Sequence, residues 1–381
     1  MIPFIDLAAQ QKRIRPQLEA AIGRVLDHGG YIMGPEIREL ETELTAFCGA
    51  SHTLTCSSGT DALVLPLMAK GIKAGDAVFV PAFTFAATAE AVAFLGATVV
   101  FIDVCPNTFN IDCENLEKGI AKAKALGLCP KGIIAVDLYG QAADYDSLNS
   151  IAANHGLWVL ADAAQSFGGT YKGRKVGTLA ETTATSFFPS KPLGGYGDGG
   201  AVFTESAEMA DILKSLRVHG QGTTKYDNVR IGMNGRCDTL QAAILLEKLK
   251  IFPEEITLRQ KVADRYNEGL AAVAITPVIE NNCQSAWAQY TVKVDPDKRA
   301  PLMEALKAEG IPTMIHYNAP LHTLKAYKDY PCAADTLPVC ESLSHCVMSL
   351  PMHPYLEAET QDHIIKQFCE ISHRLQMKRV A

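Results

Sequence analysis

The sequence lacks any long apolar run, although 48% of its 381 residues are hydrophobic. A helix that crosses a membrane needs roughly 20 predominantly apolar residues in succession, so no membrane-spanning segment is predicted. The N-terminus, from Met1 to Leu7, also lacks the basic region, apolar core and cleavage site of a signal peptide. We therefore expect a cytoplasmic protein that does not interact with a membrane.

Clusters of basic residues and paired cysteines are also missing. The formal net charge is −7, without blocks of like charge, so nucleic acid is not an expected partner. The eleven cysteines include no Cys-x-x-Cys pair. This pattern favours reduced, mostly buried thiols and predicts neither a disulfide framework nor a metal site.

Short β-branched runs alternate with helical stretches between about residues 57 and 206. Strands are predicted at 77–81, 98–102, 132–136 and 157–160, with helices at 87–95, 113–126 and 145–155. Apolar strands separated by crossover helices indicate a mostly parallel sheet covered on both faces, which is an α/β domain. No Gly-x-Gly-x-x-Gly motif follows the first strand, so a nicotinamide-dependent oxidoreductase is not favoured.

A long helix is predicted from an N-cap at Asp238 to about Leu270, with a break at Pro253. We interpret it as the bridge to a second domain and divide the chain into residues 1–250 and 251–381. In the second part, strands at 290–294 and 313–317 and helices at 300–309 and from about 360 predict a smaller α+β domain.

The prediction of function depends mainly on Asp162 and Lys191. Lys191 follows a strand-like run and precedes a glycine-rich turn, which should lead into a strand at 201–204, whereas Asp162 ends an apolar strand. A lysine can form a Schiff base with an aldehyde cofactor, and a buried carboxylate requires a partner such as a protonated pyridine nitrogen. Either residue alone has an ordinary explanation, as a surface lysine or a capping aspartate. Together they indicate pyridoxal phosphate (PLP) chemistry.

Other residues could complete such a site. Residues 57–60 are small and precede an apolar helix, which is an arrangement that binds phosphate. A serine that only caps the helix would also explain the serines at positions 57 and 58. Gln165 could donate to the phenolic oxygen of the cofactor, and the hydroxyl of Ser186 could reach its phosphate. Phe85, which follows a strand end, could stack on the ring or belong to the core.

Four motifs make the chain resemble a known family. They are Gly59-Thr60-Asp61-Ala62-Leu63, Pro81-Ala82-Phe83-Thr84-Phe85-Ala86-Ala87-Thr88, Asp162-Ala163-Ala164-Gln165-Ser166 and Ser186-Phe187-Phe188-Pro189-Ser190-Lys191. In this order they resemble the DegT/DnrJ/EryC1/StrS family of nucleotide-sugar aminotransferases, and the match extends from Phe4 to His353. The resemblance implies the PLP-dependent aspartate aminotransferase fold (type I), with a large PLP-binding domain followed by a smaller α+β domain.

The resemblance also implies roles for individual residues. Lys191 would carry the cofactor and move the proton, Asp162 would face the pyridine nitrogen, Gln165 the phenolic oxygen, and Phe85 would stack on the ring. The residues implied for the phosphate are Gly59, Thr60 and Ser186, together with Asn234 from a second subunit. L-glutamate would donate the amino group, leaving 2-oxoglutarate, and a homodimer with shared active sites would be required.

Within the family, the resemblance is greatest to aminotransferases acting on UDP-2-acetamido-2-deoxy-3-oxo-D-glucuronate in lipopolysaccharide O-antigen synthesis. It implies that Arg236, His316 and Tyr317 approach the sugar carboxylate, which suits a guanidinium fork. Asn318 stands where that group usually has proline.

Two alternatives remain at this point. A 4-keto-6-deoxy nucleotide-sugar aminotransferase would use the same cofactor residues. A PLP-binding regulator without turnover is a remote alternative, because the set of Asp162, Gln165 and Lys191 is intact. A PLP-dependent sugar dehydratase would have histidine in place of Lys191, so the lysine argues for transamination instead.

Overall fold

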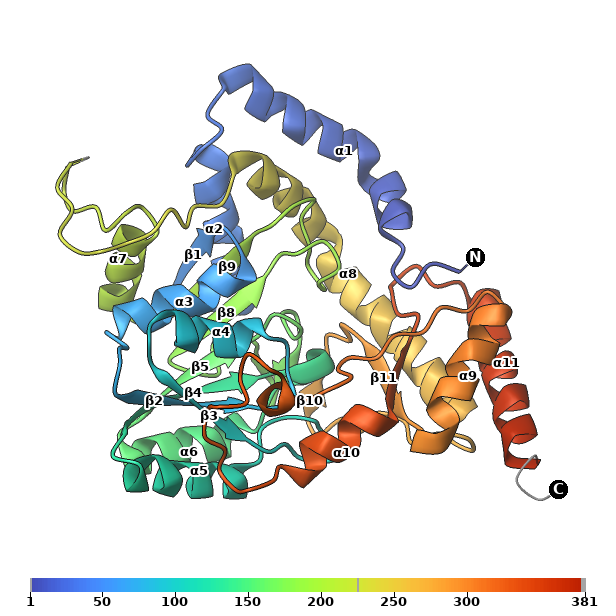
Figure 1. Cartoon of the computed structure of the whole chain (residues 1–381). Helices are drawn as coiled ribbons and strands as arrows, with labels where there is room; N and C mark the ends of the chain where they lie inside the picture. The colour runs from blue at the N-terminus through green and yellow to red at the C-terminus, as the bar shows by residue number, and fades with distance from the viewer. Residues whose placement is uncertain (1, 225, 378–381) are drawn as a thin grey trace.

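The computed structural model describes residues 2–224 and 226–377 (Figure 1). The helices are α1 (Leu7–His28), α2 (Pro35–Cys48), α3 (Gly59–Ala69), α4 (Ala87–Phe94), α5 (Cys113–Ala125), α6 (Tyr145–His155), α7 (Ala207–Leu216), α8 (Thr239–Leu270), α9 (Pro296–Ala308), α10 (Pro338–Cys346) and α11 (Ala358–Met377). The strands are β1 (His52–Cys56), β2 (Asp76–Pro81), β3 (Thr98–Ile102), β4 (Cys129–Val136), β5 (Trp158–Asp162), β6 (Thr170–Tyr171), β7 (Arg174–Lys175), β8 (Thr182–Ser186), β9 (Gly200–Thr204), β10 (Cys283–Gln284), β11 (Tyr290–Lys293) and β12 (Val347–Leu350).

The main sheet has the strand order β1-β9-β8-β5-β4-β2-β3. The pairs from β8 through β5, β4 and β2 to β3 are parallel, whereas β9 runs antiparallel to both of its neighbours. The predicted α/β class and mostly parallel sheet are therefore confirmed. The predicted strand at 201–204 is also confirmed, as β9, which begins one residue earlier than predicted. The three predicted crossover helices are confirmed as α4, α5 and α6.

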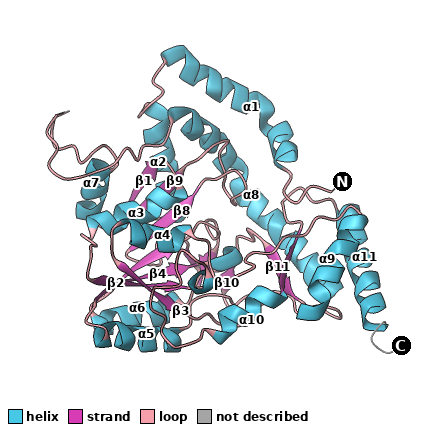
Figure 2. Ribbon diagram, viewed as in Figure 1, coloured by secondary structure: helices cyan, strands magenta, loops and turns pink. Residues whose placement is uncertain are grey.

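Successive residues of the central strands point to opposite faces of the sheet. In β2, Val78 and Val80 pack into one apolar cluster with α3, α4 and α7, while Phe79 packs into another with α5 and α6. Helices therefore lie on both sides of the strands (Figure 2). Burial on both faces explains why these strands read as continuous apolar runs in the sequence.

Helix α8 differs from its prediction in one respect. It starts after Asp238 as expected, but it continues through Pro253 to Leu270 without a break. The proline removes one backbone donor, yet apolar packing holds the helix on both sides, through Phe252 and Ile256 in one cluster and Val262 in another. Since α8 passes through position 250 as one helix, a domain boundary at 250/251 stays a prediction.

The C-terminal part has its own apolar cluster, built by the end of α8 with α9, α11 and the two-stranded sheet of β11 and β12. The helix predicted at 300–309 begins at Pro296, and the last helix begins at Ala358. The strand predicted at 313–317 is wrong: Met314 makes only an isolated bridge to Ser349. The carbonyl of His316 instead accepts a hydrogen bond from the Tyr139 hydroxyl. This carbonyl is therefore paired with a side chain and not with a neighbouring strand.

Helix α1 runs from the C-terminal part of the molecule, where the N-terminal segment lies, toward the end of the main sheet (Figure 1). Ile14 and Leu18 pack on Ile244 of α8. None of the described helices combines the length and apolar character that crossing a membrane requires. The described residues also contain no group of histidine, cysteine and acidic side chains arranged to hold a metal, and all eleven cysteines, which lie within the described ranges, are free thiols.

Candidate active site

Asp162 lies at the carboxyl end of β5, near the middle of the main sheet. Ligands of open parallel sheets bind at this edge. Only 7% of Asp162 is exposed, and its carboxylate accepts hydrogen bonds from the Thr88 hydroxyl at 2.9 Å and from the Ala164 N–H at 3.2 Å. Burial raises the pKa of Asp162, against the lowering effect of these donors and of Lys191. Both donors are neutral, so the site favours a cation facing this carboxylate.

Lys191 lies in the loop between β8 and β9, where its N–H donates to the Phe188 carbonyl at 2.9 Å. Burial lowers the pKa of its amine, and the charge of Asp162 opposes that shift. Desolvation thus moves both members of the pair toward neutrality. A lysine that loses its proton more readily than usual is suited to act as a nucleophile and as a base.

Gln165 and Phe85 lie near this pair. The side-chain oxygen of Gln165 accepts from the Tyr139 N–H at 2.6 Å, and its nitrogen donates to the Tyr317 hydroxyl at 3.2 Å. The ring centroid of Phe85 lies 6.4 Å from that of Tyr317, and 58% of Phe85 is exposed. The exposed ring fits the predicted role in stacking better than a role in the core.

The start of α3 forms a small cradle against the end of β8. The Ser58 hydroxyl accepts from the Asp61 N–H at 3.0 Å, so this serine caps the helix. The N–H groups of Gly59 and Thr60 belong to the first turn, which every helix leaves without intrahelical acceptors. A Cβ added to Gly59 would lie 2.6 Å from the Cβ of Ser186, so the glycine permits a close approach. The three residues predicted to hold a phosphate are thereby brought together.

Asn234 and Arg236 lie in the segment between α7 and α8. Gly235, which separates them, accepts a hydrogen bond from the Ser57 N–H at 3.2 Å, beside the α3 cradle. Asn234 is exposed, as expected of a side chain that reaches another subunit. The Nε of Arg236 is buried without a hydrogen-bond partner in the described part of the chain.

His316 and Tyr317 approach the same site from the C-terminal part. The Nδ1 of His316 lies 3.0 Å from the Ser349 hydroxyl, and burial followed by the charge of Lys191 lowers the pKa of the ring. Tyr317 contacts Gln165, and burial raises the pKa of its phenol. The structure therefore brings these two residues to Lys191 and Gln165.

Two site residues were not predicted from the sequence. Thr88, at 1% exposure, binds Asp162 from α4, and Tyr139 holds Gln165 through its backbone. Thr88 belongs to the motif that starts at Pro81, so the motif could have suggested it. Tyr139 carries no sequence signal, although its φ of 60° marks an unusual backbone position.

These residues fit PLP. Asp162 is a buried anion with neutral donors, which suits the pyridine nitrogen, and the cradle of Gly59, Thr60 and Ser186 suits a phosphate. The charge of Asp162 acts on the amine of Lys191, so the two residues belong to the same site.

Comparisons with known proteins identify a family and several relatives. The model of the DegT/DnrJ/EryC1/StrS aminotransferase family matches residues 12–369. The chain is 51% identical over 358 residues to the UDP-2-acetamido-2-deoxy-3-oxo-D-glucuronate aminotransferase of Pseudomonas aeruginosa, covering 94% of this chain and 96% of that protein.

Solved structures show the same fold. A DegT/DnrJ/EryC1/StrS aminotransferase from Brucella abortus superimposes with a TM-score of 0.96 at 50% identity, covering 98% of this chain and 100% of that one. The PLP form of Spr1654, a putative sugar aminotransferase from Streptococcus pneumoniae, has a TM-score of 0.87 at 27% identity and covers 94% and 96% of the two chains.

Proposed function

Because the chain belongs to the DegT/DnrJ/EryC1/StrS aminotransferase family, we propose that it transfers the amino group of L-glutamate to a nucleotide-linked 3-keto sugar. It is a PLP-dependent aminotransferase, and we propose UDP-2-acetamido-2-deoxy-3-oxo-D-glucuronate as the acceptor. The observation that carries the reaction type is that the buried carboxylate of Asp162, at the end of β5, interacts with the desolvated amine of Lys191, in the loop between β8 and β9.

When bound, PLP supplies an electron sink that stabilises the negative charge left at carbon after loss of a proton. Asp162 would keep the ring nitrogen protonated, and Gln165 would face the phenolic oxygen. Phe85 would cover one face of the ring, while Gly59, Thr60 and Ser186 would hold the phosphate. The contacts described above for each residue support its proposed role.

Lys191 would move the proton. Its amine must be neutral to accept a proton from the α-carbon of L-glutamate, and the lowered pKa favours this state. The same amine would return a proton to C3 of the sugar in the second half of the reaction. The first half releases 2-oxoglutarate and consumes one water, and the second half releases one water, so atoms balance over the cycle.

Arg236 would recognise the acceptor through its carboxylate. A guanidinium offers two parallel donors to a carboxylate, and the Nε of Arg236 is buried and unpaired within the described residues. His316 and Tyr317 would contact the same part of the sugar. The relative from Pseudomonas aeruginosa, whose name specifies this acceptor, supports the assignment.

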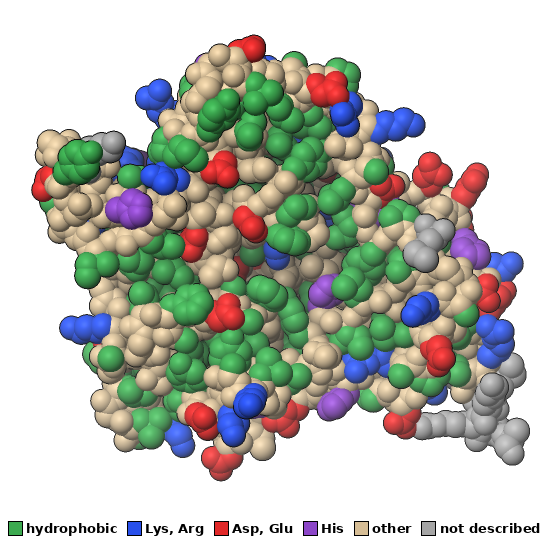
Figure 3. Space-filling model, turned by 45° about the horizontal axis from the view of Figure 1, so that its top comes forward, with side chains coloured by type: hydrophobic (Ala, Val, Ile, Leu, Met, Phe, Trp, Pro, Cys, Tyr) green, Lys and Arg blue, Asp and Glu red, His purple; other side chains and the backbone are tan. Residues whose placement is uncertain are grey.

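We propose that the active enzyme is a homodimer. Asn234 is exposed in the segment between α7 and α8, where Ile231 is 89% exposed, and Phe188 beside Lys191 is 51% exposed. Hydrophobic side chains are also prominent in the middle of the face shown in Figure 3. A second subunit would cover these side chains and place its Asn234 near the phosphate cradle. The proposed setting is cytoplasmic O-antigen sugar synthesis.

Single-turnover reactions of the pyridoxamine form with a panel of keto sugars test the acceptor. We expect rapid amination of the UDP-linked 3-oxo-uronate and poor reaction of its analogue with a hydroxymethyl group at C5. Arg236→Met should raise KM for the uronate by about 10-fold or more, because one charged hydrogen bond is lost. KM for the analogue, which has no carboxylate, should change little.

Amination of a 4-keto-6-deoxy sugar with no reaction of the 3-oxo-uronate would contradict the proposed acceptor and favour the alternative aminotransferase. Glutamate-dependent formation of the pyridoxamine form tests the remaining alternative, a regulator without turnover, which would show none.

A further inference from the structure

Four polar atoms close to the loop of Lys191 are buried without a hydrogen-bond partner in residues 2–224 and 226–377. They are the Oε1 of Gln10, the Nε of Arg259 and both ring nitrogens of His353. The three residues are 8%, 4% and 3% exposed, respectively. An unpaired buried polar group destabilises the folded state, and native proteins contain few of them. These atoms belong to three side chains in one region, which indicates that a polar ligand lies between the three side chains.

The three side chains line one small cavity, which they share with Lys191 and Asp6. It joins α1, α8, the loop of Lys191 and the segment after β12. Its volume is about 20 Å³. A single buried water needs roughly 10 to 15 Å³ and two to four polar partners, whereas a sugar or an amino acid needs far more space.

The hydrogen-bonding capacities of the lining groups match those of water. Burial lowers the pKa of His353 to about 4, with Asp6 raising it and Arg259 lowering it further, so the ring is neutral near pH 7. A neutral ring offers one donor and one acceptor. Gln10 adds an acceptor and Arg259 a donor. Because the two ring nitrogens point in different directions, one water reaches one of them and makes three hydrogen bonds, the usual number for a buried water.

We propose that this cavity holds one ordered water bound by His353, Gln10 and Arg259, and that His353 is a positioning residue that sets the surroundings of Lys191 through this water. The role of Lys191 rests on the proposed function, whereas the water site does not. Lys248, which also lines the cavity, donates from its Nζ to the Gly194 carbonyl three residues after Lys191. The loop that carries Lys191 is thereby fixed against the wall of the cavity.

Several charged or titratable groups surround Lys191 and the cavity. Asp6 comes from the N-terminal segment, Lys248, Glu255 and Arg259 from α8, Tyr355 from the segment after β12, Asp162 from β5 and His316 from the C-terminal part. Glu255 already accepts hydrogen bonds from Gln10 and Tyr355. It therefore stabilises the wall of the cavity and leaves the Oε1 of Gln10 to the water.

A crystal structure of the PLP-bound enzyme tests the site directly. We expect one ordered water within hydrogen-bonding distance of a His353 nitrogen, of the Gln10 Oε1 and of the Arg259 Nε. An empty cavity, or a His353 ring bonded directly to Asp6, would overturn the proposal. This test uses the unaltered chain and does not depend on whether a variant folds.

His353→Phe tests the link to Lys191. The phenyl ring fills the cavity and removes the polar partner, so the charged form of the Lys191 nitrogen should become less favourable. The absorbance of the bound cofactor reports this ionisation, and its pH midpoint should fall by about half a unit or more, which is a threefold or greater change in the proton equilibrium. His353→Gln keeps a donor and an acceptor, so its midpoint should lie close to that of the parent enzyme.

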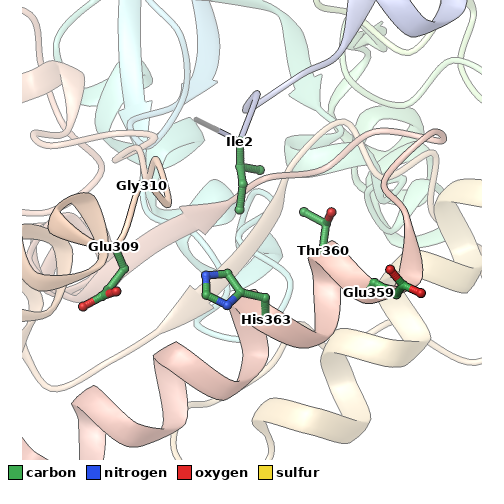
Figure 4. Close-up of a pocket in the computed structure, with 6 residues that line it drawn as sticks. All are labelled: Ile2, Glu309, Gly310, Glu359, Thr360 and His363. Carbon is green, nitrogen blue, oxygen red and sulfur yellow. The ribbon is translucent and has the colours of Figure 1, made fainter.

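His363→Phe is the matched control. His363 is an exposed residue of α11 that lines another pocket together with Glu309 and Thr360 (Figure 4). That pocket shares no lining residue with the cavity beside Lys191. The control variant should leave the midpoint unchanged. An unchanged midpoint in folded His353→Phe would refute the positioning role. Failure of the 3-oxo-uronate to react would count against the proposed acceptor only.

Discussion

The hydroxyl of Thr88 donates a hydrogen bond to the carboxylate of Asp162 at 2.9 Å, and both residues are buried. The two residues come from α4 and the end of β5, which are 74 positions apart in the sequence. The hydroxyl favours the charged carboxylate that desolvation disfavours. Thr88 thus supports the anion that would face the pyridine nitrogen of PLP.

Replacing Thr88 tests that support. Thr88→Val removes the hydroxyl, and a hydrogen bond to a charged group contributes about 1.5 to 3 kcal/mol. We expect the dissociation constant of PLP to rise by about 10-fold or more. Thr88→Ser, which keeps the hydroxyl, should bind PLP nearly as the parent does; equal affinity of the valine and serine variants would contradict the prediction.

Lys191→Ala should separate cofactor binding from turnover. The phosphate cradle and Asp162 remain, so PLP should still bind, but loosely. General acid–base catalysis contributes about 10²- to 10⁴-fold, and kcat should fall by at least that factor. Steady-state kinetics and cofactor stoichiometry measure the two effects. Lys118→Ala, at an exposed position of α5, is the control, and full activity of the Lys191 variant would remove this residue from the mechanism.

Gly59→Ala should damage the phosphate cradle. The new Cβ would lie 2.6 Å from the Cβ of Ser186, which forces the start of α3 away from β8. Overpacking of this kind costs about 1 to 3 kcal/mol. Chemical denaturation and PLP titration should both show a loss. Gly23→Ala in α1 meets nothing within 4 Å and should stabilise the protein by about 1 kcal/mol or less, so parallel behaviour of the two variants would argue against the steric reason.

The stability of the PLP-free protein should depend on pH through Asp137. Burial raises the pKa of this carboxyl to about 7, against the lowering effect of hydrogen bonds from Ser166, Ala143 and Tyr145. Since the folded pKa lies above the unfolded value, the stabilising contribution is full below about pH 4 and is lost as the pH rises through about 7.

The difference in unfolding free energy between the parent and Asp137→Asn should therefore decrease by about 2 to 4 kcal/mol between pH 4 and pH 8. Urea denaturation at several pH values measures it. Taking the difference removes most of the contribution of Asp162, whose pKa is also raised by burial and whose charge adds to the raised pKa of Asp137. Parallel curves for the two proteins would show that Asp137 does not titrate as proposed.

Much of the main sheet could be predicted from the sequence. Strands buried on both faces are continuous apolar runs, so β2, β3 and β5 are visible locally, as are the helices between them. The predicted break at Pro253 was wrong because Phe252 and Val262, on either side of the proline, pack into apolar clusters that hold the helix. The predicted strand at 313–317 was wrong because the His316 carbonyl has a side-chain partner, the Tyr139 hydroxyl, in place of a strand neighbour. Neither interaction is encoded within a short window of sequence.

The proposed chemistry can be inferred from the sequence alone, because Gly59, Asp162, Gln165 and Lys191 lie in short motifs whose order along the chain is typical of the family. The groups that surround these residues depend on the tertiary structure. Thr88 on Asp162, Tyr139 on Gln165 and the unpaired atoms of His353 near Lys191 arise from elements far apart in sequence. Burial changes the charge and hydrogen bonding of a side chain through its neighbours, and those neighbours are known only once the chain has folded.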